Sequence, residues 1–428
     1  MKSKKMTLNV RTGFLFATLI WFGACIIGAI PYLISGTMDN FIDAVFEAAS
    51  GFTTTGATVI DDFTNIPKII LFWRSLTHWL GGMGIVVLFA AIVPMWGIKG
   101  QIIAYAETPG PSKGKLTAKF ADTARDLYTI YILITLILTI LLRIADMSWF
   151  DSVTTAFSTM ATGGFANYGD NAAAFSTPVK IILLVFMYIA GINFNLYFKA
   201  RKQGLKVFFR DQELKFYTLI MIIGSLFIFA ANSFFLKGRS VGDNLLESFF
   251  NVVSINTTTG FTICDYELWP TFSKIMLFCF FFIGGCASST AGGIKVSRII
   301  ICLKLIKRSF SMRIHPNRVS NITINNMEVS SDITIKTTGF VFIYIATVFT
   351  GMLLISLSGT DLMTSFSCAA SCVANVGPGF GLVGPTLNYS LLTPLTKLIC
   401  TFLMISGRLE LYSVFVLFSK YYWNPHRG

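Results

Sequence analysis

Four short segments combine glycine with uncharged polar residues, and each lies between two apolar runs. They read ASGFTTTGAT, AFSTMATGGF, VSINTTTGFT and ASCVANVGPG, with a glycine eighth in each: Gly56, Gly163, Gly260 and Gly377. Backbone carbonyls of such segments can replace the hydration water of a cation, because glycine tolerates positive φ and leaves room where chains meet. Their lack of charge favours a monovalent cation, since a divalent one prefers carboxylate ligands.

The composition is that of an integral membrane protein. Hydrophobic residues make up 54% of the 428 residues and charged residues only 13%, whereas soluble domains carry about 25% charged residues. Uncharged stretches at 12–38, 216–236 and 337–360 are long enough to cross the ~30 Å hydrocarbon core of a bilayer. We therefore expect a multi-pass protein in a lipid membrane.

The four glycine segments share one setting along the chain. Each follows a long apolar run and a polar break near Asp39, Asp151, Asp243 or Asp361, and each precedes another apolar run. The run of about a dozen residues after each break is too short to cross the bilayer, so it must enter and return. Non-helical backbone survives at membrane depth only when it is buried in protein or lines a wet cavity.

This repetition predicts an all-α integral membrane protein with four concatenated helix–pore-loop–helix units around one pore. It would have eight spanning helices and four re-entrant half-helices. The predicted units are residues 1–100, 101–213, 214–328 and 329–428.

The net charge of +13 is concentrated in a few segments. The loops at 97–125, 199–215 and 295–336, together with both termini, hold 25 of the 34 lysines and arginines. The positive-inside rule accounts for this distribution if those segments face the cytoplasm. We therefore predict cytoplasmic termini and no nucleic-acid partner.

Carboxylates follow three of the four glycine segments. They are Asp61, Asp62, Asp170, Asp265 and Glu267. At the outer mouth of a pore they would concentrate cations. The alternative is ordinary solvated loop charge.

Other chemistry has little support in the sequence. No nucleophile, base and orienting group occur in a recognisable order, which argues against an enzyme. No nucleotide-binding glycine motif is present. Among the eight cysteines, Cys368 and Cys372 lie one helical turn apart, but two thiols alone make a poor metal site, so a packing role is expected.

Several motifs together resemble the Trk/Ktr/HKT superfamily of potassium transporters, and most closely its bacterial Trk-type membrane subunit. The motifs are SGFTTTGAT (50–58), HWLGGMGI (78–85), AETPGP (106–111), ATGGF (161–165), TTTGFT (257–262), IGGCASSTAGGIKVSR (283–298), HPN (315–317), NVGPG (375–379) and GRLE (407–410). The likeness covers nearly the whole chain. Trk-type subunits usually carry an extra helix pair ahead of the first unit, whereas this chain, like Ktr-type subunits, starts almost directly at that unit.

The resemblance implies uptake of potassium ions through a carbonyl selectivity filter. The implied filter residues are Thr54, Thr55, Gly56, Ala161, Thr162, Gly163, Thr258, Thr259, Gly260, Asn375, Val376 and Gly377. A glycine in all four loops matches the potassium-selective pattern, while relatives with serine in the first loop tend to pass sodium. The alternatives are a sodium or mixed monovalent cation transporter and, in another class, a non-conducting membrane scaffold or enzyme.

The resemblance also implies a gate below the filter. Small residues at 284–293 break the sixth apolar run, and a positive charge at Arg408 interrupts the last one. The implied gate residues are Gly284, Gly285, Ser288, Ser289, Thr290, Gly292, Gly293 and Arg408. Close helix packing by small residues and a structural ion pair at Arg408 are the alternatives. Glu410 points elsewhere on a helix and is not the expected partner.

The implied setting is the bacterial cytoplasmic (inner) membrane. Members of the superfamily form homodimers on a cytosolic ring of nucleotide-binding regulatory subunits. The basic inner loops and the C-terminal YYWNPHRG sequence offer docking surfaces for such a ring.

Overall fold

The computed structural model describes residues 10–84, 120–315 and 321–423. These residues are helical apart from loops and one hairpin, formed by β1 (Thr323–Ile324) and β2 (Met327–Glu328). The predicted all-α membrane fold is confirmed. The AETPGP sequence and most of the first basic loop lie outside the described residues.

A long helix, a short helix, a loop and a further helix follow one another four times along the chain. The sets are α1 (Val10–Ile34), α2 (Phe41–Phe52) and α3 (Lys68–Gly82); α6 (Phe120–Ile144), α7 (Trp149–Met160) and α8 (Thr177–Ala190); α11 (Gln212–Phe235), α12 (Val241–Asn256) and α13 (Thr271–Ile283); and α15 (Ser331–Ser356), α16 (Leu362–Ala374) and α17 (Pro394–Arg408). We call these the first to fourth sets, and α2, α7, α12 and α16 the pore helices. The boundaries of the predicted units stay a prediction.

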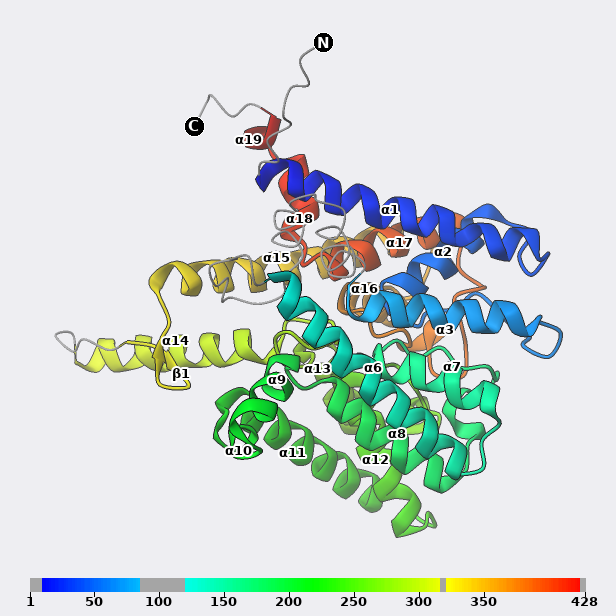
Figure 1. Ribbon diagram of the computed structural model, residues 1–428, viewed down its shortest axis with the longest axis horizontal. Coiled ribbons are helices and arrows are strands. Elements are labelled where there is room, and N and C mark those ends of the chain that lie inside the picture. The colour runs from blue at the N-terminus through cyan, green and yellow to red at the C-terminus, as the bar shows by residue number, and fades with distance from the viewer. Residues whose placement is uncertain (1–9, 85–119, 316–320, 424–428) are drawn as a thin grey trace.

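Further elements connect and end the sets. They are α9 (Phe194–Gln203), α10 (Lys206–Arg210), α14 (Val296–Ile314), α18 (Tyr412–Phe415), α19 (Lys420–Trp423) and the 3-10 helices η2 (Asn171–Ala174), η3 (Tyr266–Leu268), η4 (Gly381–Val383) and η5 (Val416–Phe418). In Figure 1, α14 extends away from the main helical body beside the hairpin.

Neighbouring sets meet in a closed cycle. Helix α3 contacts α7, α8 contacts α12, α13 contacts α16, and α17 returns to α2. Figure 1 shows the consequence, because the blue α1 and α2 lie beside the red α17 although they are far apart in sequence. This cycle brings the four loops toward one centre.

The long helices have the length and composition of membrane spans. Among the described residues, Thr12–Ile34, Ala124–Ile144, Gln212–Phe235 and Ser331–Ser356 qualify alone, and two bent pairs, α8 with α9 and α17 with α18, raise the number to six. Exposed side chains such as Ile27 and Ile34 on α1 give the apolar outer surface that lipid requires. The predicted number of eight spans stays a prediction.

The pore helices have exposed N-termini and buried C-termini. Asn40 and Asp361 accept hydrogen bonds from the first backbone N–H groups of α2 and α16, and Ser148 does so for α7. In α7 and α12 the predicted acidic residues, Asp151 and Asp243, lie in the first turn instead. Acceptors and negative charge stabilise helix N-termini, so these polar breaks start the short helices as expected.

Glycines let α3 and α17, the helices that follow the first and fourth loops, approach the pore helices α2 and α16 closely. A Cβ atom at Gly81 would lie 1.9 Å from the Phe52 carbonyl oxygen, and one at Gly407 would lie 2.2 Å from that of Val373. Any side chain there would push the two helices apart. Gly81, the first residue of the GGMG sequence (81–84), thus serves close helix packing.

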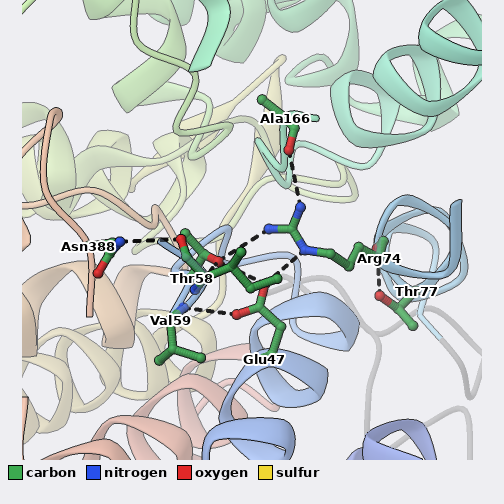
Figure 2. Close-up of polar contacts among 8 residues, drawn as sticks. Glu47, Thr58, Val59, Arg74, Thr77, Ala166 and Asn388 are labelled. Atoms are coloured by element: carbon green, nitrogen blue, oxygen red, sulfur yellow. Dashed lines mark hydrogen bonds and ion pairs between the residues drawn. The ribbon is translucent and has the colours of Figure 1, made fainter. Parts of the chain in front are cut away.

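A buried ion pair ties the first pore helix to the surrounding loops (Figure 2). Arg74 Nε lies 2.9 Å from Glu47 Oε1, and both side chains are almost fully buried at 1% and 0% exposure. Glu47 also accepts from Thr58 Oγ1 and the Val59 amide, at 2.9 and 3.0 Å. Arg74 Nη1 donates to the Ala166 carbonyl at 3.1 Å. One network thus joins α2, α3 and the loops that follow α2 and α7.

The Arg74 guanidinium is also enclosed by aromatic rings. It lies 4.0 Å from the centroid of Phe165 and 5.0 Å from that of Phe63. Such stacking compensates part of the cost of desolvating a cation. The partners of Glu47 and Arg74 leave little of either charge uncompensated.

The network yields a stability prediction. Glu47→Gln removes one charge and leaves Arg74 buried without its counter-ion, so unfolding should become easier by about 3–5 kcal/mol. Thermal unfolding of the detergent-solubilised protein measures the effect. The exposed pair of Asp332 with Lys336 is the control, and Asp332→Asn should change stability by no more than about 1 kcal/mol. Equal effects of the two variants would contradict the structural role of Glu47.

Candidate functional site

The chain makes the same turn at the end of every pore helix. One non-glycine residue at this turn has a positive φ in each loop: Thr54, Thr162, Thr258 and Asn375, with φ of 55°, 54°, 57° and 58°. Three of them are β-branched, for which this conformation is strained and uncommon. A strained backbone repeated at one place in four loops points to a functional constraint there.

The next residue in each loop binds back to a serine of its pore helix. Its N–H donates to the carbonyl oxygen of Ser50, Ser158, Ser254 or Ser371, with N···O distances of 2.9, 2.8, 2.8 and 3.0 Å respectively. The donors are Thr55, Gly163, Thr259 and Val376. This bond closes the helix C-terminus and satisfies a carbonyl that would otherwise lack a partner. A glycine with positive φ follows: Gly56, Gly164, Gly260 or Gly377.

This geometry corrects the sequence alignment of the second loop by one residue. The alignment set Gly163 against Gly56, but Gly163 occupies the place of Thr55 and Gly164 the place of Gly56. Ala161 accordingly corresponds to Thr53 rather than Thr54. The loop contains two consecutive glycines, so the pattern alone could not decide which one needs the positive φ.

The four loops interlock in a ring. A Cβ atom at Gly56 would lie 2.1 Å from the Gly163 carbonyl oxygen, and one at Gly164 would lie 2.0 Å from that of Thr259. The third loop repeats the contact at 2.1 Å, from Gly260 to the Val376 oxygen, and Gly377 returns to the Thr55 oxygen at 2.5 Å. Every loop therefore needs a glycine to fit against a carbonyl of the next loop.

Threonine hydroxyls brace this backbone. Thr53 Oγ1 lies 2.8 Å from Thr55 Oγ1 in the first loop, and Thr257 Oγ1 lies 2.7 Å from Thr259 Oγ1 in the third. In the fourth loop, Asn375 Nδ2 donates to Thr55 Oγ1 at 3.0 Å and to the Met404 carbonyl at 2.9 Å. These contacts support a bracing role for the hydroxyls.

The pore helices also set the electrostatics of the ring. Their buried C-termini end at the four left-handed turns. A helix C-terminus carries about half a negative elementary charge. Four such ends directed at one centre favour a cation there.

The small-residue segment at 284–293 lies directly beside this ring. Helix α13 ends at Ile283 and α14 begins at Val296, so the predicted helix break is present. The Gly292 N–H donates to Thr258 Oγ1 at 2.7 Å. A Cβ atom at Gly292 would lie 2.1 Å from the Ala374 carbonyl oxygen, so the segment contacts both the third and the fourth loops.

Contacts at both ends fold the segment back on itself. Gly284 and Gly293 have positive φ and lie against each other at its base. Ser289 Oγ donates to the Cys286 carbonyl at 2.6 Å. Residues at the break between α8 and α9 bind the segment through two backbone hydrogen bonds. The Cys286 N–H donates to the Gly191 carbonyl at 2.9 Å, and the Phe194 N–H donates to the Ser288 carbonyl at 3.0 Å. Gly285 also packs on Gly191.

Arg408 connects this segment to the first set. Its Nη1 donates to the Thr290 carbonyl at 2.9 Å, and its Nη2 donates to the carbonyls of Gly81 and Gly82 at 2.5 and 2.8 Å. Glu410, which lies just after the end of α17, pairs with Arg298 at 2.7 Å.

Of the five acidic residues named from the sequence, Asp61, Asp62, Asp170 and Asp265 lie in the loops that follow the ring residues, and Glu267 lies in η3. Asp61 accepts from Asn388 Nδ2 and Ser390 Oγ of the fourth set, at 2.7 and 2.8 Å. Asp265 caps η3, and Asp170 precedes η2 with an exposed side chain. Hydrogen bonds from the Thr64 side chain and backbone lower the pKa of exposed Asp62 below its ordinary value, so this carboxylate stays ionised at neutral pH.

The sequence analysis missed several residues that position the ring. Glu47 and Arg74 are charges within apolar runs, a signal that marks functional or paired residues at membrane depth. Glu213 was also missed: its Oε1 accepts from the N–H groups of Ala287 and Ser297, at 2.7 and 3.1 Å. It thereby fixes the segment at 284–293 to the start of α14.

Comparisons with known proteins agree over almost the entire chain. The sequence model of TrkH, described as a cation transport protein, matches residues 1–425. The Trk system potassium uptake protein TrkH of Salmonella typhimurium is 36% identical over 430 residues, which cover 99% of this chain and 88% of that protein. TrkG of Escherichia coli, another Trk system potassium uptake protein, is 34% identical over 428 residues, 99% of this chain and 87% of that one.

A solved structure has the same fold. The crystal structure of the potassium transporter TrkH from Vibrio parahaemolyticus matches with a TM-score of 0.87 and 32% identity, covering 99% of this chain and 88% of that chain. The chain therefore belongs to the TrkH family of cation transport proteins, which are transporters and not enzymes.

Proposed function

We propose that the protein takes up potassium ions through the ring of four interlocked loops. The observation that carries this proposal is the closed series of glycine–carbonyl contacts, which repeats one backbone geometry around one centre. The relatives named as potassium uptake proteins support the choice of ion.

In this proposal, carbonyl oxygens replace the water around the ion. The predicted filter residues, together with Gly164, supply the oxygens. One layer of carbonyls comes from the four residues that occupy the same place in their loops, namely Thr55, Gly163, Thr259 and Val376. Neutral oxygens bind a monovalent cation firmly enough for entry but weakly enough for release. The C-terminal ends of the pore helices add favourable potential without a fixed charge in the path.

The proposed gate is the segment at 284–293. Its contact through Gly292 with the Thr258 hydroxyl and the hydrogen bond from Arg408 to its Thr290 carbonyl support this role. In this proposal the segment moves when the pore conducts. The small side chains of the segment favour such a local rearrangement. The acidic residues Asp61, Asp62, Asp170 and Asp265 are proposed to attract cations at the outer mouth.

The proposed setting is the bacterial inner membrane, with both termini in the cytoplasm. A homodimer and a ring of cytosolic nucleotide-binding subunits are the proposed partners, because the resemblance to the Trk/Ktr/HKT superfamily implies them. The relatives' naming as parts of a Trk system is compatible with further components. Exposed basic residues in α9 and α14, such as Arg201 and Arg313, offer charge for docking.

The first prediction from this proposed function concerns ion selectivity. Gly56→Ser adds a side chain against the Gly163 carbonyl, so the preference for potassium over sodium should fall by about tenfold or more, equivalent to about 1.4 kcal/mol. Ion flux in liposomes measures it. The control is Gly169→Ser, since a Cβ atom at Gly169 would meet nothing within 4 Å. Unchanged selectivity of Gly56→Ser would show that Gly56 is not in the filter, and sodium flux alone in the parent protein would favour a sodium transporter.

The second prediction tests the corrected register. Gly164→Ala places a Cβ atom 2.0 Å from the Thr259 carbonyl oxygen at a positive φ, which should lower the unfolding temperature and potassium flux. Gly169→Ala in the same loop should change neither. Full activity and stability of Gly164→Ala would contradict the assigned ring.

The third prediction concerns the gate. Arg408→Met removes the donors to Thr290, Gly81 and Gly82, so potassium flux without any regulatory partner should rise severalfold. Arg313→Met replaces an exposed arginine of α14 and should leave flux unchanged. A stable Arg408→Met protein with the parent's flux would remove Arg408 from the gate.

A further inference from the structure

Three cysteine thiols gather behind the fourth loop, outside the ring itself. Cys368 and Cys372 lie one turn apart on α16, and α17 brings Cys400 to them. The three sulfur atoms lie within 4.8 Å of one another, and Cys368 Sγ is 3.4 Å from Cys400 Sγ. All three residues are fully buried. The sequence showed only the pair on α16, for which a packing role was expected.

The donor set selects one class of metal ion. Sulfur ligands bind soft cations, whereas potassium and magnesium prefer oxygen. Structural zinc sites almost always have four ligands, so three converging thiols better suit a soft d10 ion that accepts three-coordination. The cluster therefore differs in chemistry from the proposed potassium path.

Charge balance narrows the class of metal ion further, to divalent cations. The cluster lies in an apolar core with Phe46, Leu403 and Met404, where an uncompensated charge would be costly. A divalent cation that displaces the protons of two thiols and keeps the third thiol neutral forms a neutral complex. The released protons leave with solvent, as in other thiolate metal sites.

The cluster is linked to the fourth loop in two ways. Cys372 lies in the last turn of α16, and its carbonyl accepts the Asn375 N–H at 3.4 Å. Tyr389 packs in the same core as the thiols, and its hydroxyl donates to the Gly377 carbonyl at 2.7 Å. A change in the spacing of the sulfurs would thus reach both Asn375 and Gly377.

We propose that Cys368, Cys372 and Cys400 form a binding site for a soft divalent cation, and that occupation of this site alters the fourth filter loop through Tyr389. The binding step stands on the thiol geometry alone. The effect on transport rests on the proposed function of the ring.

Cadmium ions are a suitable probe of binding. The purified protein is incubated with Cd²⁺ for increasing times, since buried sulfurs require local opening before they bind. Thiolate-to-cadmium absorption in the ultraviolet should appear with one ion per chain in the parent protein. It should be lost in Cys400→Ser and kept in Cys302→Ser, which changes a cysteine on α14. Absence of the absorption in the parent, or its persistence in Cys400→Ser, would overturn the site.

Potassium flux in liposomes tests the link to the filter. Cd²⁺ should change flux in the parent protein but not in Cys400→Ser, which excludes a block by acidic residues at the mouth. Tyr389→Phe should still bind Cd²⁺, while the response of its flux should be smaller than in the parent, because the link from Tyr389 to Gly377 is lost. Equal responses of the parent and Cys400→Ser would refute the link. If the parent conducts no potassium at all, the proposed function fails, while the absorption experiment still decides the metal site.

Discussion

The contact between a glycine of one loop and a carbonyl of the next is the constraint on which the rest of the structure depends. The contact occurs four times and closes on itself, so no loop can shift without moving its neighbours. Extended backbone at membrane depth also needs hydrogen-bond partners from protein, and the serine carbonyls of the pore helices provide them. Short pore helices, close glycine packing and buried polar networks all follow from holding this backbone in place.

The four sets keep the backbone and vary the side chains behind it. In each pore helix, the position three residues before the serine that accepts the loop N–H has a different side chain. It is Glu47, Thr155, Asn251 or Cys368 in the first to fourth sets. Glu47 forms the buried ion pair with Arg74, Asn251 donates to Cys264 Sγ at 3.3 Å, and Cys368 belongs to the thiol cluster. Different chemistry at one structural position indicates that these side chains support the loops, whereas the backbone path is common to all four loops.

The sequence predicted the features that are local and repeated. Apolar run length, polar breaks and glycine segments were sufficient for the all-α membrane fold and the helix break at 284–293. It could not choose between Gly163 and Gly164, because both satisfy the same local pattern. It also could not pair Glu47 with Arg74 or add Cys400 to the two thiols of α16, since helix packing between distant segments creates these contacts.

The position of Arg408 explains why the proposed gate would need an outside source of energy. Its guanidinium joins the segment at 284–293 to the C-terminal carbonyls of α3, where the helix dipole stabilises positive charge. In that position it both holds the segment and places a positive charge near the proposed cation path. Opening must break hydrogen bonds to a charged donor, each of which contributes about 1.5–3 kcal/mol. A potassium ion that binds equally well to the closed and open states cannot supply this energy, because only differential binding shifts an equilibrium. A partner that contacts α14 could supply it, since Glu213 binds both the segment and the first turn of that helix.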